Sequence, residues 1–335
     1  MKKILLPFFT FLILGGTFVY AFFGVENISE ADLRNDLNAY VSLSNQPRFS
    51  FINVGDMMFD RGVEFYMDRG SDLFGLIGHE WARLLKDGGF LVGNLEGPIT
   101  DSQKCQKKAY SFKFASSTAK LIFENGFRLV NLANNHSFDC YEKGIEDTEA
   151  NLSNAGVAFF GAALTGDSYS VKIIDGKRVV FLGIEDTMIP ANIEKSSALV
   201  KKLKTENDFL VVDIHWGSEY EKGMTKRQIK FGHSLIDNGA DVVIGHHPHV
   251  IEPIEIYKDK AIFYSLGNFI FDQLEEDTNK GIAVGVDLSD KAEFRFKIFP
   301  YEIIKSRPQF FAPSETLSFC DDYLKNIPNG KECSF

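Results

Sequence analysis

Positive charge and cysteine are both scarce in this chain of 335 residues. It carries 36 Lys and Arg against 46 Asp and Glu, so its formal net charge is −10. An acidic chain has neither the electrostatic footprint for nucleic acid nor a charge attraction to an acidic membrane surface. The four cysteines match no common zinc motif by their spacing. We therefore expect no nucleic-acid partner, and a thiolate zinc centre is disfavoured.

Three catalytic motifs are also missing. The chain has no G-x-S-x-G, in which serine hydrolases hold their nucleophile. No G-x-G-x-x-G follows a strand, and no G-x-x-x-x-G-K-[ST] occurs, so the common dinucleotide and nucleotide phosphate loops are absent. Serine hydrolase, dinucleotide-dependent and P-loop chemistries are therefore disfavoured.

The N-terminal segment lacks charge from Ile4 to Phe23, directly after two lysines. A run of that length can span a bilayer as a helix, and the lysines favour a cytoplasmic N-terminus. Residues 1–24 are therefore expected to be a membrane anchor, or a signal peptide cleaved near Ala21. Phe22 and Phe23 extend the apolar run past that cut, which favours the anchor. Both alternatives place the protein at the extracytoplasmic face of the cell envelope, membrane-anchored in one and secreted in the other.

An exported chain can keep disulfides. Its cysteines are Cys105, Cys140, Cys320 and Cys333, and four cysteines allow three pairings. The sequence cannot choose among them, although closeness along the chain favours Cys320–Cys333. Free buried thiols remain an alternative.

Strands that alternate with helices predict an α/β fold after a polar connector at 25–48. The first part is expected to hold a largely parallel sheet. Antiparallel strands after about residue 160, including a hairpin that turns at Asp175-Gly176, predict a mixed or second sheet. We expect one domain over 49–304 and a C-terminal tail at 305–335, packed on the domain or trailing it.

Polar side chains follow five of the predicted strands. Because ligands bind beyond the carboxyl ends of strands in open α/β sheets, these clusters should meet at one edge. Each cluster alone is typical of a helix cap or turn, but their shared position favours a common site. The residues are Asp56; Asn94 and Glu96; Asn134, Asn135 and His136; His215; and His246, His247 and His249.

Carboxylate, amide and imidazole groups form a mixed oxygen and nitrogen ligand set. This set suits divalent manganese, iron, zinc or magnesium. There are enough ligands for two ions, with one carboxylate able to bridge them. Two ions about 3.5–4 Å apart can clamp a phosphate and activate a water. The sequence therefore predicts a divalent-metal site at this edge.

The histidine-rich stretch GHHPHV has its own local expectation. Pro248 disfavours a helical conformation at His247 and favours an extended one. Residues two apart point the same way in an extended segment, so His247 and His249 should present two imidazoles to one ion. His246 should then face away or support a ligand, and we expect it to be dispensable.

An ordered set of motifs resembles a known family. GDMMFDRG, NLEGPIT, NLANNHSFD, HWGSEY, GHHPHV and YSLGNFIFD are similar to the CapA-type proteins of poly-γ-glutamate capsule biosynthesis, over Phe51 to Asp272. That family in turn resembles the calcineurin-like metallophosphoesterases. The resemblance implies a four-layer α/β/β/α sandwich with two mixed β-sheets and a two-metal centre at the strand ends.

The resemblance also implies roles for individual residues. His136 would be catalytic, as a general acid or a substrate contact, with Asp139 as its acidic partner. Substrate-binding positions would be Asn94, Asn134 and Asn268. The implied metal ligands are Asp56, Glu96, Asn135, His215, His247 and His249.

Two functions fit this resemblance. One is an extracytoplasmic metal-dependent hydrolase that acts on a phosphoester, an amide or an acyl-phosphate of the polymer. The other is a non-catalytic, polymer-binding or scaffolding subunit of a capsule assembly or export complex. The expected partners are an anionic polymer or phosphoester, the membrane, and capsule synthesis or export proteins. A lysine cluster (Lys104, Lys107, Lys108 and Lys113) could attract a polyanion, although a solvated loop also accounts for it.

Overall fold

The computed structural model describes residues 13–14, 17–18, 49–68, 77–85, 89–161, 168–205, 208–275, 277–288 and 295–324. Of the expected anchor it describes only β1 (Ile13–Leu14) and β2 (Thr17–Phe18), an antiparallel pair. The connector at 25–48 lies outside the described residues. Within the described ranges, no helix is long and apolar enough to cross a membrane. Membrane anchoring stays a prediction.

An eight-stranded mixed sheet is formed from the two ends of the domain. Its parallel part is β3 (Phe51–Met57), β4 (Leu91–Leu95), β5 (Phe127–Asn131) and β6 (Ala158–Phe160), with β13 (Asn268–Ile270) parallel to β3. Its antiparallel part is β14 (Lys280–Asp287), β15 (Arg295–Ile304) and β16 (Arg307–Phe310), and β14 joins it to β3. The expectation that the first part is largely parallel is confirmed.

A second, six-stranded mixed sheet has the order β11-β12-β10-β9-β8-β7. The central strands β8 (Lys177–Glu185), β9 (Phe209–His215), β10 (Val242–His246) and β12 (Lys260–Phe263) are parallel, and the outer β7 (Tyr169–Ile174) and β11 (Ile254–Tyr257) are antiparallel. β7 and β8 form the predicted hairpin. Asp175 and Gly176 both have positive φ, 49° and 75°, as a two-residue turn matched to strand twist requires.

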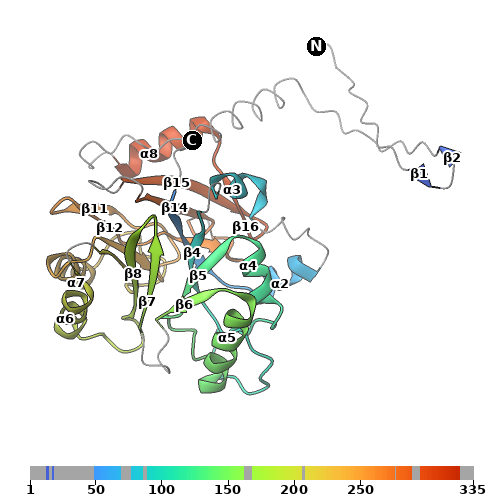
Figure 1. Cartoon of the computed structure of the whole chain (residues 1–335), viewed down its shortest axis with the longest axis horizontal. Helices are drawn as coiled ribbons and strands as arrows, with labels where there is room; N and C mark the ends of the chain where they lie inside the picture. Colours follow the sequence, from blue (N-terminus) through green and yellow to red (C-terminus); the bar gives the residue numbers. More distant parts are fainter. Residues whose placement is uncertain are drawn as a thin grey trace, which may run out of the picture. The chain divides into compact units, whose positions relative to one another are not determined.

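The main apolar core lies between the two sheets. Phe51 of β3 packs edge-on against Phe181 of β8, with ring centroids 5.1 Å apart, and Val92 and Val211 lie in the same cluster. Helices α6 (Ile193–Leu203) and α7 (Lys226–Asp237) pack on the six-stranded sheet through a second cluster that includes Trp216. Figure 1 shows them beside that sheet, with α4 (Thr118–Glu124) and α5 (Tyr141–Ala155) near β5 and β6.

Within the described residues, the C-terminal region packs on the domain as far as residue 324. β16 pairs with β15, and α8 (Pro313–Leu324) contributes Phe319 and Cys320 to the core between the sheets. Trp81 of α3 (Gly78–Leu84) packs on Phe310 and donates its indole N–H to the carbonyl of Pro308 at 3.0 Å. Residues 307–310 are therefore an edge strand of the larger sheet.

A disulfide joins Cys105 to Cys140, 35 residues apart. Cys140 directly precedes α5, so the bond fastens the 101–117 loop to the start of that helix. Cys320 is also disulfide-bonded, while its predicted partner Cys333 lies outside the described residues. Sequence alone left the Cys105–Cys140 pairing open, because only the folded loop brings these sulfurs together.

We predict that Cys105→Ser/Cys140→Ser lowers the free energy of unfolding by roughly 3–4 kcal/mol, the loop-closure value for a ring of this size. The unfolded chain gains freedom when the ring is opened. Chemical denaturation followed by tryptophan fluorescence measures the change. An unfolding midpoint equal to that of the parent protein would contradict a structural role for this bond.

Candidate metal centre

The ends of strands from both sheets converge on one cluster of polar side chains. Asp56 is the penultimate residue of the fully buried strand β3, and its neighbour in β4 is Asn94. In the other sheet, His215 of β9 lies beside His246 of β10. Asn94 bridges the sheets, since its amide nitrogen donates to Asp56 Oδ1 at 2.9 Å and lies 3.3 Å from His215 Nδ1. The structure thus brings the five strand-end clusters together.

Two glycines allow the strands that carry the site to approach closely. A Cβ on Gly55, next to Asp56, would stand 2.0 Å from the carbonyl oxygen of Gly267. A Cβ on Gly245, next to His246, would stand 1.9 Å from the carbonyl oxygen of Tyr264. Real Cβ atoms do not make such contacts, so these motif positions require glycine.

Asp56, Glu96 and His249 form the tightest group of potential ligands. One ligand atom from each lies within 4.8 Å of the others, and all three side chains are buried. His249 Nδ1 is 3.4 Å from Asp56 Oδ2, and His249 Nε2 is 3.7 Å from Glu96 Oε1. Neither carboxylate oxygen of Glu96 has a hydrogen-bond partner in the described part of the chain. A buried carboxylate without partners is costly, and a cation would remove that cost. The group therefore fits a metal ion.

A second group of ligands lies on the other side of Asp56. The rings of His215 and His247 have centroids 4.8 Å apart. Asn135 Oδ1 is 2.9 Å from His215 Nε2. His247 Nδ1 is buried without a hydrogen-bond partner among the described residues, and its backbone N–H donates to Asp56 Oδ2 at 3.2 Å. Two imidazoles and an amide oxygen are ligands of the type predicted for a second ion.

The protonation of the two groups differs. Burial raises the pKa of Glu96 to about 8. Burial alone would lower the pKa of His249, but the charge of Glu96 and the hydrogen bond to Asp56 outweigh it and raise the value to about 9. Burial, reinforced by the charge of His249, lowers the pKa of His247 to about 4, and burial also holds the pKa of His215 well below its usual range. Without metal, the first group holds at least one proton near pH 7, and the second offers neutral imidazoles.

The three asparagines predicted to bind substrate are buried behind the ligands. Asn94 Oδ1 accepts from Asn134 Nδ2 at 3.1 Å and from Asn131 Nδ2 at 3.4 Å. Asn268 Oδ1 lies 2.9 Å from His249 Nδ1, and its amide donates to Gln273 and to the carbonyl of Thr278. Asn94 therefore fixes Asp56, and Asn268 orients His249. These amides are thus engaged within the protein, and substrate binding by Asn94, Asn134 and Asn268 stays a prediction.

His136 lies at the rim of the metal group. Its Nδ1 is 2.8 Å from Asp139 Oδ2, and its Nε2 is 3.8 Å from Glu96 Oε1. Asp139 is itself held by the backbone N–H of Phe112 at 2.7 Å and by Lys108 Nζ at 2.5 Å from Oδ1. Burial lowers the pKa of His136 despite the bond to Asp139. The imidazole is therefore neutral near pH 7, with the proton at Nδ1 toward Asp139 and the lone pair at Nε2.

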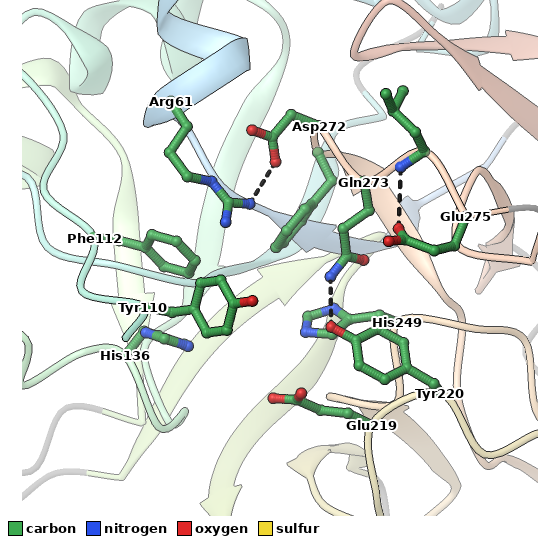
Figure 2. A pocket seen from close by; sticks show the side chains of 12 residues that line it. Arg61, Tyr110, Phe112, His136, Glu219, Tyr220, His249, Asp272, Gln273 and Glu275 are labelled. Atoms are coloured by element: carbon green, nitrogen blue, oxygen red, sulfur yellow. Dashed lines mark hydrogen bonds and ion pairs between the residues drawn. The ribbon is translucent and has the colours of Figure 1, made fainter. Parts of the chain in front are cut away.

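A pocket of about 330 Å³ opens over His136 and His249. Figure 2 shows Arg61, Tyr110 and Phe112 on one side and Tyr220 and Glu219 on the other. Of the candidate ligands, His249 lines this pocket, together with His136 and several aromatic side chains, and the volume is large enough for part of a ligand.

A sequence profile described as bacterial capsule synthesis protein PGA_cap matches residues 50–273. The chain belongs to this family. The PGA biosynthesis protein CapA of Bacillus subtilis (strain 168) is 30% identical over 276 residues, covering 76% of this chain and 72% of that protein. The capsule biosynthesis protein CapA of Bacillus anthracis is 30% identical over 304 residues, covering 82% of this chain and 72% of that protein. The resemblance to CapA-type capsule proteins is thereby confirmed.

Likeness to solved structures is low. The 5'-nucleotidase precursor from Thermus thermophilus has a TM-score of 0.44 and 14% identity, covering 82% of this chain and 59% of that chain. A score of this size assigns neither fold nor chemistry.

The histidine loop is not extended, contrary to the sequence prediction. His247 and His249 have φ of 98° and 58°, in the left-handed region. Their rings are 6.1 Å apart and tilted by 52°, so His249 joins Asp56 and Glu96 while His247 joins His215. Pro248 does prevent a right-handed helix, but the hydrogen bonds from His247 to Asp56 and from Tyr220 to the carbonyl of Pro248 hold the strained loop.

Of the two alternatives expected for His246, the structure agrees with support of a ligand and not with a side chain that faces away from the site. It is buried with Nδ1 3.1 Å from Asp56 Oδ1 and Nε2 3.4 Å from Asp213 Oδ1. Burial alone would lower the pKa of His246, but the hydrogen bonds to Asp213 and Asp56 raise it to about 9. A charged His246 therefore holds Asp56 in place. No sequence signal pointed to Asp213, because that side chain lies inside a strand.

We predict that His246→Ala destabilises the protein by roughly 3–5 kcal/mol, the cost of breaking a buried ion pair. Metal affinity should fall about 10–100-fold, as when a ligand loses its supporting partner. Thermal unfolding and metal titration measure both effects. His233→Ala is the control, since His233 pairs with Glu255 while the two side chains are 29% and 30% exposed. Equal, small effects of the two variants would restore the view that His246 is dispensable.

Proposed function

We propose that this capsule biosynthesis protein is a membrane-associated, extracytoplasmic hydrolase that depends on two divalent metal ions. The observation that carries the proposal is the buried Glu96 carboxylate, which has no hydrogen-bond partner among the described residues and faces Asp56 and His249. The domain would be a four-layer α/β/β/α sandwich of the metallophosphoesterase type. Manganese, iron, zinc and magnesium all suit the ligand set.

The residues divide into two proposed ligand groups around Asp56. Asp56, Glu96 and His249 would hold one ion, and Asn135, His215 and His247 the other, with Glu96 or Asp56 placed to bridge. Ions held there would supply Lewis acidity toward the bond to be cleaved. His246 and Asn94 keep Asp56 in position, and Asn268 keeps the ring of His249 in position.

His136 would move the proton. Its Nδ1 is fixed by Asp139, so Nε2 is the atom that faces Glu96 and the pocket. A neutral imidazole in this orientation can take a proton at Nε2 and return it to a leaving group. Lys108 balances the charge of Asp139, which keeps that carboxylate an acceptor for Nδ1.

The proposed substrates are a phosphoester, or an amide or acyl-phosphate in a glutamate polymer. The relatives from Bacillus are named as proteins of PGA and capsule biosynthesis, which supports a polymer of this kind. The pocket over His136 and His249 is the place at which a segment of such a chain would bind.

The proposal is tested with the full-length chain in detergent, loaded in turn with manganese, iron, zinc or magnesium. Hydrolysis of an activated phosphodiester and of poly-γ-glutamate is followed, with Glu96→Gln as the inactive control. Metal-dependent turnover of either substrate that Glu96→Gln abolishes supports a hydrolase. Absence of turnover by a metal-loaded protein that still binds the polymer contradicts it and favours the polymer-binding subunit.

We predict that His136→Gln lowers kcat about 10²–10⁴-fold, the usual contribution of a positioned acid–base group. Bound metal should stay unchanged, because the structure places His136 beside the ligand group and not within it. Turnover and metal content are measured on the same preparation. An unchanged kcat, or a parallel loss of metal, would contradict a proton-transfer role.

A further inference from the structure

Arg61 has an unusual backbone conformation at the mouth of the pocket. Its φ is 53°, although it is not glycine, and it opens α2 (Arg61–Asp68) directly after Asp60. A non-glycine residue in the left-handed region costs about 1–2 kcal/mol. Asp60 fixes this turn, since its carboxylate accepts the backbone N–H groups of Arg61 at 2.7 Å and of Lys113 at 2.9 Å. The chain is therefore held in a strained state that aims the Arg61 side chain.

The ion pair of Arg61 does not by itself offset this strain. The Arg61 guanidinium pairs with Asp272, but the two side chains are 35% and 18% exposed. Ion pairs with that much solvent contact contribute about 0–1 kcal/mol, less than the strain. Strained residues of this kind concentrate at functional sites.

The guanidinium stands among aromatic rings that lead to His136. Its central carbon is 5.0 Å from the ring centre of Phe112, 5.8 Å from Tyr110 and 5.9 Å from Phe271. The Phe112 ring in turn lies 4.3 Å from the ring of His136. Arg61 is thus separated from His136 by one aromatic side chain (Figure 2).

The Arg61 guanidinium has N–H donors left with which it can bind a ligand. Among the described residues, it is bonded to Asp272 alone, which uses one of its two terminal nitrogens. Arginine carries five N–H donors in a planar fork that fits a carboxylate or a phosphate. The pocket lining carries three carboxylates, Glu219, Asp272 and Glu275, and Arg61 is the one arginine or lysine among its described lining residues, so an anionic group would meet positive charge at Arg61.

We infer that Arg61 binds an oxyanion of the substrate, a carboxylate or a phosphate, beside His136 and the ligand groups. The ring of Tyr110, which is 60% exposed, packs on the apolar part of the same ligand, whereas Phe112 and Phe271 are 4% and 2% exposed. This inference rests on the proposed function for the reaction that follows, but binding itself requires no turnover. Arg61 is accordingly a specificity-determining residue, and Asp272 positions it.

The test is calorimetric titration of the full-length chain, with and without manganese, by three probes. They are γ-linked triglutamate, the same peptide with every carboxylate converted to an amide, and phenyl phosphate. Wild type is compared with Arg61→Gln, Arg61→Lys and the control Lys201→Gln, which removes an exposed positive charge on α6. Melting temperature and bound manganese are measured for each protein.

Arg61→Gln should weaken binding of the anionic probe at least about 10-fold, since hydrogen bonds to charged groups are strong. Arg61→Lys should lose part of that affinity and Lys201→Gln none. Preference for triglutamate over its amide identifies a carboxylate, and preference for phenyl phosphate identifies a phosphate. Should Arg61→Gln fail to fold, Arg61→Lys and the amide probe test the same contact.

Equal affinity of wild type and Arg61→Gln for the anions would overturn the inference. So would the absence of measurable binding of either anion by wild type at millimolar concentration. A protein that binds through Arg61 yet hydrolyses nothing would uphold this inference while the proposed hydrolase function fails.

Discussion

Glu96→Gln should remove metal from the Asp56–Glu96–His249 group and weaken metal affinity more than the roughly 10–100-fold that loss of a supporting partner causes. An amide keeps the size of the side chain but offers a poorer, neutral ligand oxygen. Metal per protein after equilibrium dialysis gives the result directly. Glu64→Gln, an exposed change on α2, is the control. Full metal occupancy in Glu96→Gln would contradict the role of Glu96 as a ligand.

The same variant should change how the stability of the metal-free protein depends on pH. Burial raises the pKa of Glu96 from 4.5 to about 8, so the folded state keeps a proton that the unfolded state loses. The contribution of Glu96 is therefore least unfavourable below pH 4.5 and becomes more unfavourable up to about pH 8. Relative to wild type, Glu96→Gln should gain stability across that window. Chemical denaturation in chelator at pH 5, 6.5 and 8 measures the difference, and a difference constant with pH would refute the buried, unpaired carboxylate.

The second large effect that we expect concerns the metal affinity of the wild type, which should rise steeply with pH. His249 and Glu96, with pKa values raised to about 9 and about 8, must both lose a proton before they can bind an ion. Displacement of one to two protons from this coupled pair gives an affinity gain of roughly 10- to 100-fold per pH unit below about pH 8. His215 and His247 add little, because their pKa values are already lowered.

Chelator competition at pH 6, 7 and 8 measures this slope, and titration in buffers of different ionisation enthalpy counts the protons released. Glu96→Gln serves as the internal control, because it should shed one proton fewer on binding. Affinity that does not change between pH 6 and 8 would contradict the proton-holding state of the Asp56–Glu96–His249 group.

The parts of the site that could be predicted are those set by strand ends. A polar residue at the end of a buried strand, such as Asp56 or His215, lies at the edge of the sheet. The polar residues that end the neighbouring strands lie at the same edge. The two mixed sheets and the Asp175-Gly176 hairpin follow from the same regularities of pattern and turn chemistry.

The parts that could not be predicted depend on contacts between distant segments. The left-handed backbone at His247 and His249 is held by Asp56 and Tyr220, which belong to other segments of the chain. The burial of Asn94 depends on Asn131 and Asn134 in the next strand and loop. Neither local propensity nor motif spacing contains these contacts, and they decide which residues bind an ion and which hold the ligands in place.

The central claim is that the strand-end cluster holds divalent metal through two groups of side chains around Asp56. Anomalous X-ray scattering from crystals grown with manganese tests it most directly. We predict one peak bonded by Asp56, Glu96 and His249 and a second bonded by Asn135, His215 and His247. Density without an anomalous peak at this cluster, in a protein saturated with manganese, would contradict the claim.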